Sequence, residues 1–422
     1  MKPTFTIHLT YLNFFLIFLS ILFISNTSPI TFSDVAIIAT FLLLLFVSII
    51  KKIKYDPIVF YISGAWILTN LISYLYNRTT FPTATIISYL LRMFIPYLTI
   101  KLFGNQYWIK LEKAIFYLTL ISLVIYAFNL LAPGIFISLD KVFGNFAAKI
   151  YKEKASQAHF WYAFVYTFLG RTDSDRFRNC GFMWEPGAFA MILGIVILLN
   201  WFRNNFRIDF KIIVYLIALI STFSTMGYIS LLFLILIYIV NKGSLLFKVL
   251  LFLSFAYFIP TVLDQDFIGP KIQQYITEAQ YDQSFKQTNT GDYEMNRIST
   301  FIFSLEKVFR LPTGFGVVPD KSYFKNVRIN LVGVNGLGGI LVFWGWFGLI
   351  FLIYALKKFC KKIINPDISM ISLALTISVI LISFFSNPIE RNFLLFALIL
   401  TPFIKEFKEN IIDEDIPEEI NE

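Results

Sequence analysis

The chain has 422 residues, of which 57% are hydrophobic and 18% aromatic, while only 15% are charged. A water-soluble domain of this length is nearer half apolar and richer in charge, so the composition excludes an ordinary soluble enzyme. The net charge of +9 lies mainly in short connectors between apolar segments, where membrane orientation explains it without nucleic acid. We therefore expect an all-α polytopic membrane protein.

Apolar segments near twenty residues recur along the chain, each long enough to cross a hydrocarbon core of roughly 30 Å. The first is too long for a signal-peptide core and lacks a small-residue cleavage site, so we expect it to be retained. The sequence predicts about twelve transmembrane helices in a single integral membrane domain, 1–422. The expected spans are 5–25, 30–50, 57–76, 83–103, 112–132, 184–202, 208–223, 227–241, 245–263, 336–356, 367–387 and 391–404.

Positive charge alternates between the connectors. One set of alternate connectors, with the N-terminus, contains eighteen lysines and arginines, whereas the short connectors of the other set contain only Arg78 and Arg391. Because cytoplasmic connectors are enriched in these residues, both termini are expected in the cytoplasm, including the acidic tail 405–422. The long connectors 133–183 and 264–335 are then extracytoplasmic, and we expect the chemistry on that side.

Neither long connector predicts a separately folded domain. Within the first, the sequence HFWYAFVYTFLG at 159–170 is apolar but too short to span, which favours an interfacial or re-entrant helix. The second contains the apolar-periodic sequence RISTFIFSLEKVF. The topology puts the two cysteines, Cys180 and Cys360, on opposite sides of the membrane, so we expect no disulfide. No metal-ligand spacing is present.

Arg92 lies near the middle of the expected span 83–103. A central arginine costs about 2.5–3.5 kcal/mol on insertion scales, so it should face the bundle interior or a wet cavity. Two interpretations stay open: a structural pair with a carbonyl or carboxylate, or contact with an anionic headgroup or pyrophosphate.

The sequence RNCGFMWEPGA places charge at the extracytoplasmic mouth of a predicted span. Pro186 is favoured in the first turn of a helix, which puts Glu185 at the cap. Free N–H groups at a helix N-terminus attract anions, and Arg176 and Arg178 add positive charge just upstream. Glu185 either caps the helix electrostatically, or orients Arg178, or accepts a proton from a sugar hydroxyl.

A run of hydroxyl side chains, STFSTMG, separates the next two predicted spans at the same surface. Small residues let two helices approach closely, and packing is one interpretation of this run. The other is the polar floor of a pocket that includes Ser224.

Three passages together resemble the O-antigen polymerase and O-antigen ligase superfamily, the Wzy/WaaL type of bacterial inner-membrane glycosyltransferase. RNCGFMWEPGAFA resembles the family's Arg…Gly-Phe…Glu-Pro-Gly/Asn entry to a span, and STFSTMGYISLLF resembles its small polar segment before a span. Arg297-Ile298-Ser299, LPTGFGVVPD and VNGLGGILVFWGWFGLIFLIY follow the order of the family's loop, in which Arg precedes a Pro-x-Gly-x-Gly turn and an Asn motif.

The resemblance implies an inverting transfer of glycan from undecaprenyl pyrophosphate to a sugar hydroxyl at the periplasmic face, without metal or cofactor. It implies that Arg178 and Arg297 neutralise the pyrophosphate, because arginine forks pair well with phosphate oxygens. The predicted catalytic residues are therefore Glu185, Arg178 and Arg297. The further candidates for binding pyrophosphate or glycan are Arg92, Arg176, Ser224, Arg310 and Asn335.

One position departs from the family pattern. Family ligases carry a histidine before the Asn of the last motif, and this chain has Val334 before Asn335. The departure favours a polymerase over a ligase and leaves the base open, with Glu185 the first candidate and Glu294 the second. A flippase or other transporter of lipid-linked oligosaccharide is the alternative from another class. Expected partners are an undecaprenyl-pyrophosphate-linked oligosaccharide, membrane lipids and a chain-length regulator protein.

Overall fold

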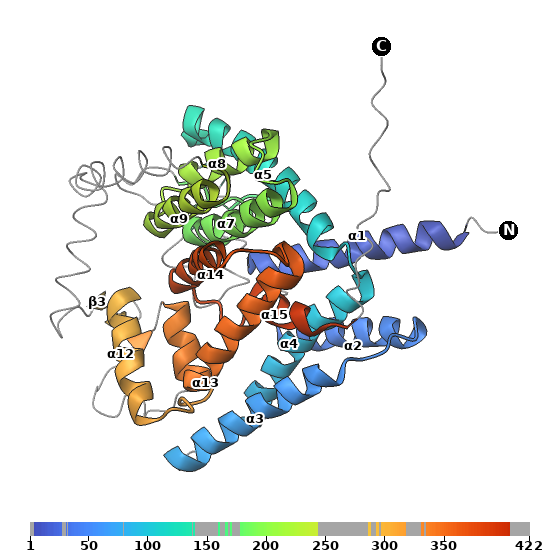
Figure 1. The fold of residues 1–422 in the computed structure, drawn as a ribbon, viewed down its shortest axis with the longest axis vertical. Helices are drawn as coiled ribbons and strands as arrows, with labels where there is room; N and C mark the ends of the chain where they lie inside the picture. Colours follow the sequence, from blue (N-terminus) through green and yellow to red (C-terminus); the bar gives the residue numbers. More distant parts are fainter. Residues whose placement is uncertain are drawn as a thin grey trace.

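The computed structural model describes residues 4–27, 31, 33–78, 80–136, 138–139, 159–160, 165–167, 169–170, 178–243, 286–287, 293–294, 297–317, 331–332 and 335–405. These residues form an all-helical protein of membrane type (Figure 1). The helices are α1 (Thr4–Ser25), α2 (Asp34–Ile50), α3 (Pro57–Asn77), α4 (Thr83–Phe103), α5 (Tyr107–Leu131), α7 (Pro186–Arg203), α8 (Phe210–Ser221), α9 (Thr225–Lys242), α12 (Arg297–Arg310), α13 (Gly336–Phe359), the π-helical turn η2 (Cys360–Ile364), α14 (Met370–Phe385), α15 (Phe393–Leu400) and the 3₁₀ turn η3 (Thr401–Phe403).

Helices occupy eleven of the twelve segments predicted as spans, and the remaining one, 245–263, lies outside the described residues. Within the described chain, six helices are long and apolar enough to cross a membrane: α3, α4, α5, α7, α9, and α13 with η2. The apolar helices α2, α8, α14 and α15 are shorter. Twelve residues of α8, for example, extend only about 18 Å at 1.5 Å per residue.

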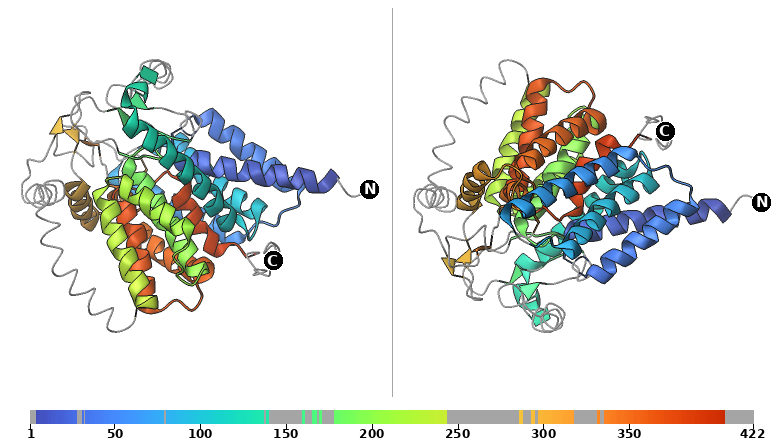
Figure 2. Two further views of the ribbon diagram at one scale, coloured as in Figure 1. Left: turned by 90° about the horizontal axis from the view of Figure 1, so that it is seen from above. Right: turned by 90° about the horizontal axis from the view of Figure 1, so that it is seen from below.

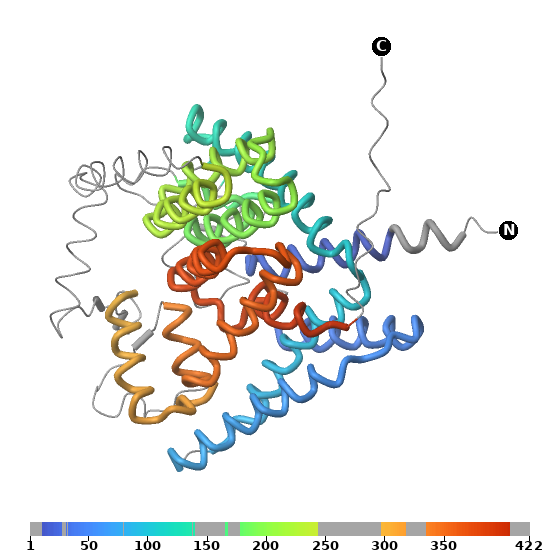
Figure 3. The backbone as a smooth tube through the Cα atoms, in the orientation of Figure 1, coloured from blue at the N-terminus to red at the C-terminus, as the bar shows by residue number. Residues whose placement is uncertain are grey.

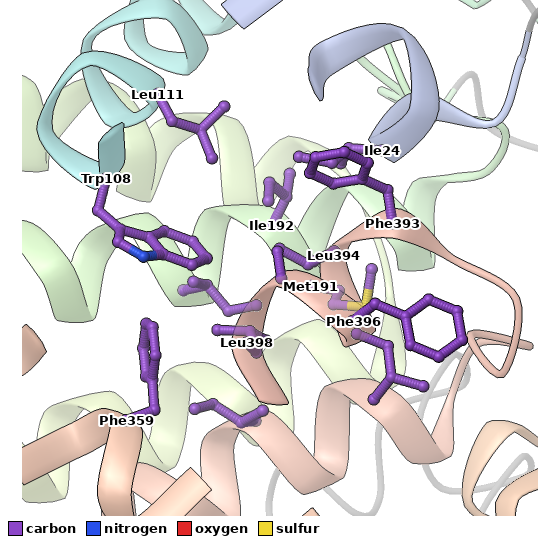
Figure 4. Packing of buried hydrophobic residues seen from close by; sticks show 14 of the residues in the cluster. Ile24, Trp108, Leu111, Met191, Ile192, Phe359, Phe393, Leu394, Phe396 and Leu398 are labelled. Atoms are coloured by element: carbon purple, nitrogen blue, oxygen red, sulfur yellow. The ribbon is translucent and has the colours of Figure 1, made fainter. Parts of the chain in front are cut away.

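The helices pack around α7 and α15, which are buried along nearly their whole lengths. Figures 1 and 3 show α14 and α15 between the group α1–α4 and the group α7–α9. Figure 2 shows the chain's N-terminal helix α1 extending away from the bundle. In the core, Met191 and Ile192 of α7 meet Phe393 and Leu394 of α15 (Figure 4). Large apolar side chains stay exposed on the outward faces of the surrounding helices, as lipid-facing helices require.

Helix α13 is broken at Gly345, where the backbone has φ 68° and ψ −165°. The turn 311–317, which contains the LPTGFG sequence, fits into this break: the Trp346 N–H donates to the Pro312 carbonyl at 2.9 Å. Helix α3 holds the other side of the turn, because Asn70 Oδ1 accepts from the Val317 N–H at 3.1 Å. The glycine-rich motif therefore joins α12, α13 and α3 and fixes where α12 lies.

Substituting Gly345 with alanine should destabilise the fold by about 3 kcal/mol or more, since this region of φ and ψ is open essentially to glycine alone. An added Cβ would also lie 2.1 Å from the Pro312 carbonyl oxygen. Thermal unfolding in detergent measures the effect. Gly64→Ala on α3 is the matched control, since a Cβ there meets nothing within 4 Å. Equal unfolding temperatures for the two variants would contradict this account of the kink.

The long connectors contain one segment that differs from the sequence prediction and one that agrees with its apolar periodicity. The predicted helix over 159–170 is wrong for the described residues, because β1 (His159–Phe160) pairs antiparallel with β2 (Leu169–Gly170). The aromatic and β-branched composition of this stretch suits strands better than a helix. The apolar-periodic segment of the second connector does form α12. A second small sheet contains β3 (Lys286–Gln287), β4 (Tyr293–Glu294) and β5 (Leu331–Val332).

Candidate functional site

The segment 178–185 is anchored on the break between α8 and α9, so two of the sequence motifs are in contact. Arg178 Nε donates to the Thr222 carbonyl at 3.1 Å, and Asn179 Nδ2 donates to Ser221 Oγ at 2.9 Å. Asn179 Oδ1 accepts from the Gly181 N–H at 2.9 Å, in a tight turn where Gly181 has φ 53°. Ser224 caps the N-terminus of α9, and its hydroxyl accepts from the Gly227 N–H at 3.3 Å.

The third motif joins this group through an ion pair. Arg297 Nη2 lies 3.8 Å from Glu185 Oε1, and both side chains are about 30% exposed, at 31% and 29%. Asn335 connects the start of α12 to the start of α13: its Nδ2 donates to the Arg297 carbonyl at 3.0 Å, and its Oδ1 accepts from the Gly338 N–H at 2.7 Å. Two predicted catalytic residues, 112 positions apart in sequence, are therefore neighbours.

The N-termini of α7, α9 and α13 meet at one end of the bundle, which we call the site end. A Cβ added at Gly187 of α7 would lie 3.3 Å from Ser386 Oγ, 3.4 Å from Asn387 Oδ1 and 3.7 Å from Ser224 Oγ. A Cβ at Gly336 of α13 would overlap the Asn387 carbonyl oxygen at 2.0 Å. The positive ends of these helix dipoles, with Arg178 and Arg297, make the site end favourable for an anion.

Polar groups at the site end are incompletely paired. Ser386 and Asn387 are buried, and Ser386 Oγ and Asn387 Oδ1 have no hydrogen-bond partner among the described residues. At the opposite end (the distal end), the buried carboxylates of Asp56 and Glu112 have basic partners, although Asn200 Nδ2 there also lacks a hydrogen-bond partner among the described residues. Lys101 Nζ lies 3.0 Å from Asp56 Oδ2 with both side chains almost fully buried. Buried polar groups are normally paired, so unpaired ones indicate a place where a ligand or water binds.

Glu390 is a charged residue of the site end that the sequence analysis missed. It lies in the connector between α14 and α15, and its carboxylate packs 3.1 Å from the position of a Cβ at Gly339. Its Oε2 is buried without a hydrogen-bond partner in the described chain. Burial raises the pKa of this carboxyl above 4.5, against the opposing influence of Arg391. The available signal was the polar sequence SNPIERN between two apolar segments.

Because the pKa of Glu390 is raised, we expect the stability of the folded protein to fall as pH rises. The folded state holds this proton more tightly than the unfolded chain, so its contribution is complete below pH 4.5 and is lost as pH rises through the folded pKa. Glu390→Gln should therefore raise the unfolding temperature above that of the wild type at neutral pH and flatten its decline with pH. Glu306→Gln, at an exposed site on α12, is the control. An unchanged pH profile in Glu390→Gln would contradict the assignment.

Not every predicted site residue joins this group. Arg310 lies at the far end of α12 from Arg297, about 20 Å along the helix axis, and pairs with Glu306 on the surface at 3.4 Å. The geometry therefore gives no support to a role for Arg310 beside Arg297. Arg176 lies outside the described residues, as does Val334, and Glu294 lies in β4.

Arg92 belongs to a separate cluster at the site end. Its Nη2 donates to the Thr31 carbonyl at 3.0 Å, which corresponds to the carbonyl pairing considered from the sequence. One turn earlier on α4, Tyr89 contacts Arg391: Arg391 Nε donates to Tyr89 Oη at 2.8 Å, and the guanidinium carbon lies 5.0 Å from the ring centroid.

The cysteines are not redox partners. Cys180 and Cys360 are both free and buried, as expected from the sequence. Burial raises the pKa of the Cys180 thiol, although Arg178 acts in the opposite direction. Among the described residues no group of three or more His, Cys, Asp or Glu side chains is arranged to hold a metal ion.

Fold and site together define an all-helical protein of membrane type with a cationic, incompletely paired polar site at one end of its helices. No protein-family model matches the chain, and no curated protein matches it.

Proposed function

We propose that this protein is a polysaccharide polymerase that joins lipid-linked repeat units at the periplasmic face of the bacterial inner membrane. The observation that carries the proposal is the Glu185–Arg297 ion pair, together with the contacts that hold Arg178 on Thr222 and Asn335 on Arg297. It brings together the three passages whose order resembles the O-antigen polymerase and ligase superfamily.

The orientation rests on the distribution of positive charge. Connectors at the distal end contain the lysine and arginine clusters, whereas the short site-end connectors contain Arg78 and Arg391. The positive-inside rule then puts the distal end and both termini in the cytoplasm and the site end in the periplasm. If 245–263 and the shorter apolar helices are counted as spans, the proposed protein crosses the membrane about twelve times.

The orientation predicts which engineered cysteines an impermeant maleimide labels in intact cells. Pro388→Cys, exposed at the site end, should react without permeabilisation, while Lys54→Cys, exposed at the distal end, should react only after it. The native cysteines are buried, so they give little background. The reverse pattern would overturn the orientation.

In the proposed reaction, each charged residue has a role that its position permits. A hydroxyl oxygen of the acceptor sugar attacks the anomeric carbon of the donor glycan, the bond to the pyrophosphate oxygen breaks, and the lipid pyrophosphate leaves with the electron pair. Arg178 and Arg297 stabilise the negative charge that develops on the leaving group. Glu185, 3.8 Å from Arg297, accepts the hydroxyl proton in this scheme. Attack opposite the leaving group inverts the anomeric configuration.

The position of the site favours a transferase over a transporter. Transporters place substrate near the midplane of the membrane, commonly at unwound helices. Here Arg178 precedes α7, Arg297 begins α12, and Ser386 Oγ and Asn387 Oδ1, unpaired among the described residues, follow α14. All lie at the end of the bundle where the long connectors lead into α7 and α13. Val334, in place of the family histidine, favours polymerase over ligase.

Surface polysaccharide from a deletion strain tests the function. With the gene removed, a gel should show single repeat units attached to the cell's glycolipid and no ladder of longer chains, and the wild-type gene should restore the ladder. An intact ladder would contradict the proposal. Complete absence of attached repeat would instead indicate a ligase or a flippase.

A further inference from the structure

The cluster around Arg92 and Arg391 shares the α14–α15 connector with the candidate site, but among the described residues no hydrogen bond or ion pair joins Arg92 or Arg391 to Glu185 or Arg297. Tyr89 and Arg92 are three residues apart on α4 and so share a face of that helix. Arg391 covers the Tyr89 ring from the α14–α15 connector, with Nε 2.8 Å from the tyrosine oxygen. Two guanidiniums from different elements therefore lie on one side of α4 at the site end.

Neither guanidinium is neutralised by a close carboxylate. Asp34, which accepts from Ser88 Oγ at 3.2 Å, and Glu390 are the acidic residues nearby. Within the described parts of the chain, no carboxylate lies within 4.0 Å of Arg92 or Arg391. Burial raises the pKa of the Glu390 carboxyl, a direction that reduces its negative charge beside the two arginines. Two arginine forks without a carboxylate partner match phosphate oxygens.

An apolar groove of about 310 Å³ lies next to this cluster, lined by residues of α3, α4, α13 and α15. Trp66 in its wall stacks on Tyr89 with ring centroids 5.5 Å apart, and Met93 directly follows Arg92. The groove opens to the lipid side, since Tyr61 and Phe347 at its edge are 72% and 62% exposed. The buried indole nitrogens of Trp66 and Trp344 have no partner within the described chain.

The arginine cluster and the lipid-facing groove meet at the Tyr89–Trp66 stack, and together they match one kind of ligand, a phosphate joined to a long apolar chain. We infer that Arg92, Arg391 and this groove form a second lipid-phosphate site, separate from the site of Glu185 and Arg297. Under the proposed function, on which this reading of its role depends, a polymerase handles two lipid-linked substrates. The second site then holds the phosphate group of one while Arg178 and Arg297 act on the other.

Binding of a long-chain polyprenyl phosphate to the purified full-length protein in detergent tests the inference, with native mass spectrometry as the readout. Arg92→Gln and Arg391→Gln should each weaken binding about tenfold, the loss expected for one charge-assisted contact. Arg78→Gln, at an exposed arginine of another site-end connector, should bind like the wild type. If all three variants bind polyprenyl phosphate as tightly as the wild type does, the proposed second site is wrong.

Two further probes distinguish recognition of the apolar chain from recognition of the phosphate group. Ala65→Phe fills the groove and should weaken polyprenyl phosphate binding without changing binding of inorganic pyrophosphate. The matching polyprenol without phosphate should bind poorly. If pyrophosphate alone binds as tightly as the lipid and Ala65→Phe has no effect, the groove has no part in recognition and the inference fails.

A wild-type experiment covers the case in which an arginine variant does not fold. A photoreactive polyprenyl phosphate should crosslink to peptides of α3, α4 and α13 that line the groove. Crosslinks confined to α7 and α9 would contradict the second site. The proposed function is tested by a separate experiment, since loss of polymer in Arg178 and Arg297 variants does not depend on lipid binding at Arg92 and Arg391.

Discussion

Replacing Arg297 or Arg178 with lysine should lower the rate of polymer synthesis about ten- to a hundredfold, because each change keeps the charge but removes the guanidinium fork. A charge-assisted hydrogen bond to phosphate contributes about 1.5–3 kcal/mol, and 1.4 kcal/mol corresponds to a tenfold change. Arg297 is within 3.8 Å of Glu185, and Arg178 is held on the Thr222 carbonyl at 3.1 Å, so lysine reproduces neither geometry. Initial rates of chain extension in membranes carrying equal amounts of each variant measure the loss.

Arg310→Lys is the matched control for both arginine variants. Arg310 is on the same helix as Arg297, is exposed, and has its own glutamate partner. It should leave the rate unchanged. Full activity in both Arg178→Lys and Arg297→Lys would show that the pyrophosphate role is wrong.

Glu185→Gln should reduce turnover by about 10²–10⁴-fold if Glu185 accepts the hydroxyl proton, with the apparent KM for the lipid-linked substrate nearly unchanged. If Glu185 only positions Arg297, the same variant should raise KM, and most of the turnover should remain. The ion pair at 3.8 Å permits both roles, so the division between kcat and KM decides between them. Glu306→Gln breaks the comparable pair on the surface of α12 and is the control. Wild-type kinetics in Glu185→Gln would exclude both roles.

Most helices of the fold could be predicted from apolar length alone. Boundaries were less accurate: α5 begins at Tyr107 rather than residue 112, and the last helical turn after α13 continues to Ile364. The break at Gly345 was not predicted, because it depends on the turn 311–317 fitting against α13, a contact between separate elements. Local pattern also failed at 159–170, where a short apolar run suits either a helix or strands.

The residues that meet at the candidate site come from passages that the sequence alone singles out as polar groups beside apolar spans. Sequence order does not give contacts, however, and nothing local indicates that Glu185 reaches Arg297. Arg310 is a candidate beside Arg297 through the family resemblance alone. Their separation becomes clear only once α12 is a continuous helix. Glu390 and Asn387 were missed because a short polar connector between apolar helices is normally a solvated turn.

Chain extension by the purified protein tests the central claim most directly. The full-length protein is reconstituted in lipid vesicles with undecaprenyl-pyrophosphate-linked repeat units as both donor and acceptor, and products are separated by size. The account predicts a ladder of longer lipid-linked glycans with release of undecaprenyl pyrophosphate, and its absence in the Arg178→Lys, Arg297→Lys double variant. Repeat units that remain single with active, correctly folded wild-type protein would contradict it.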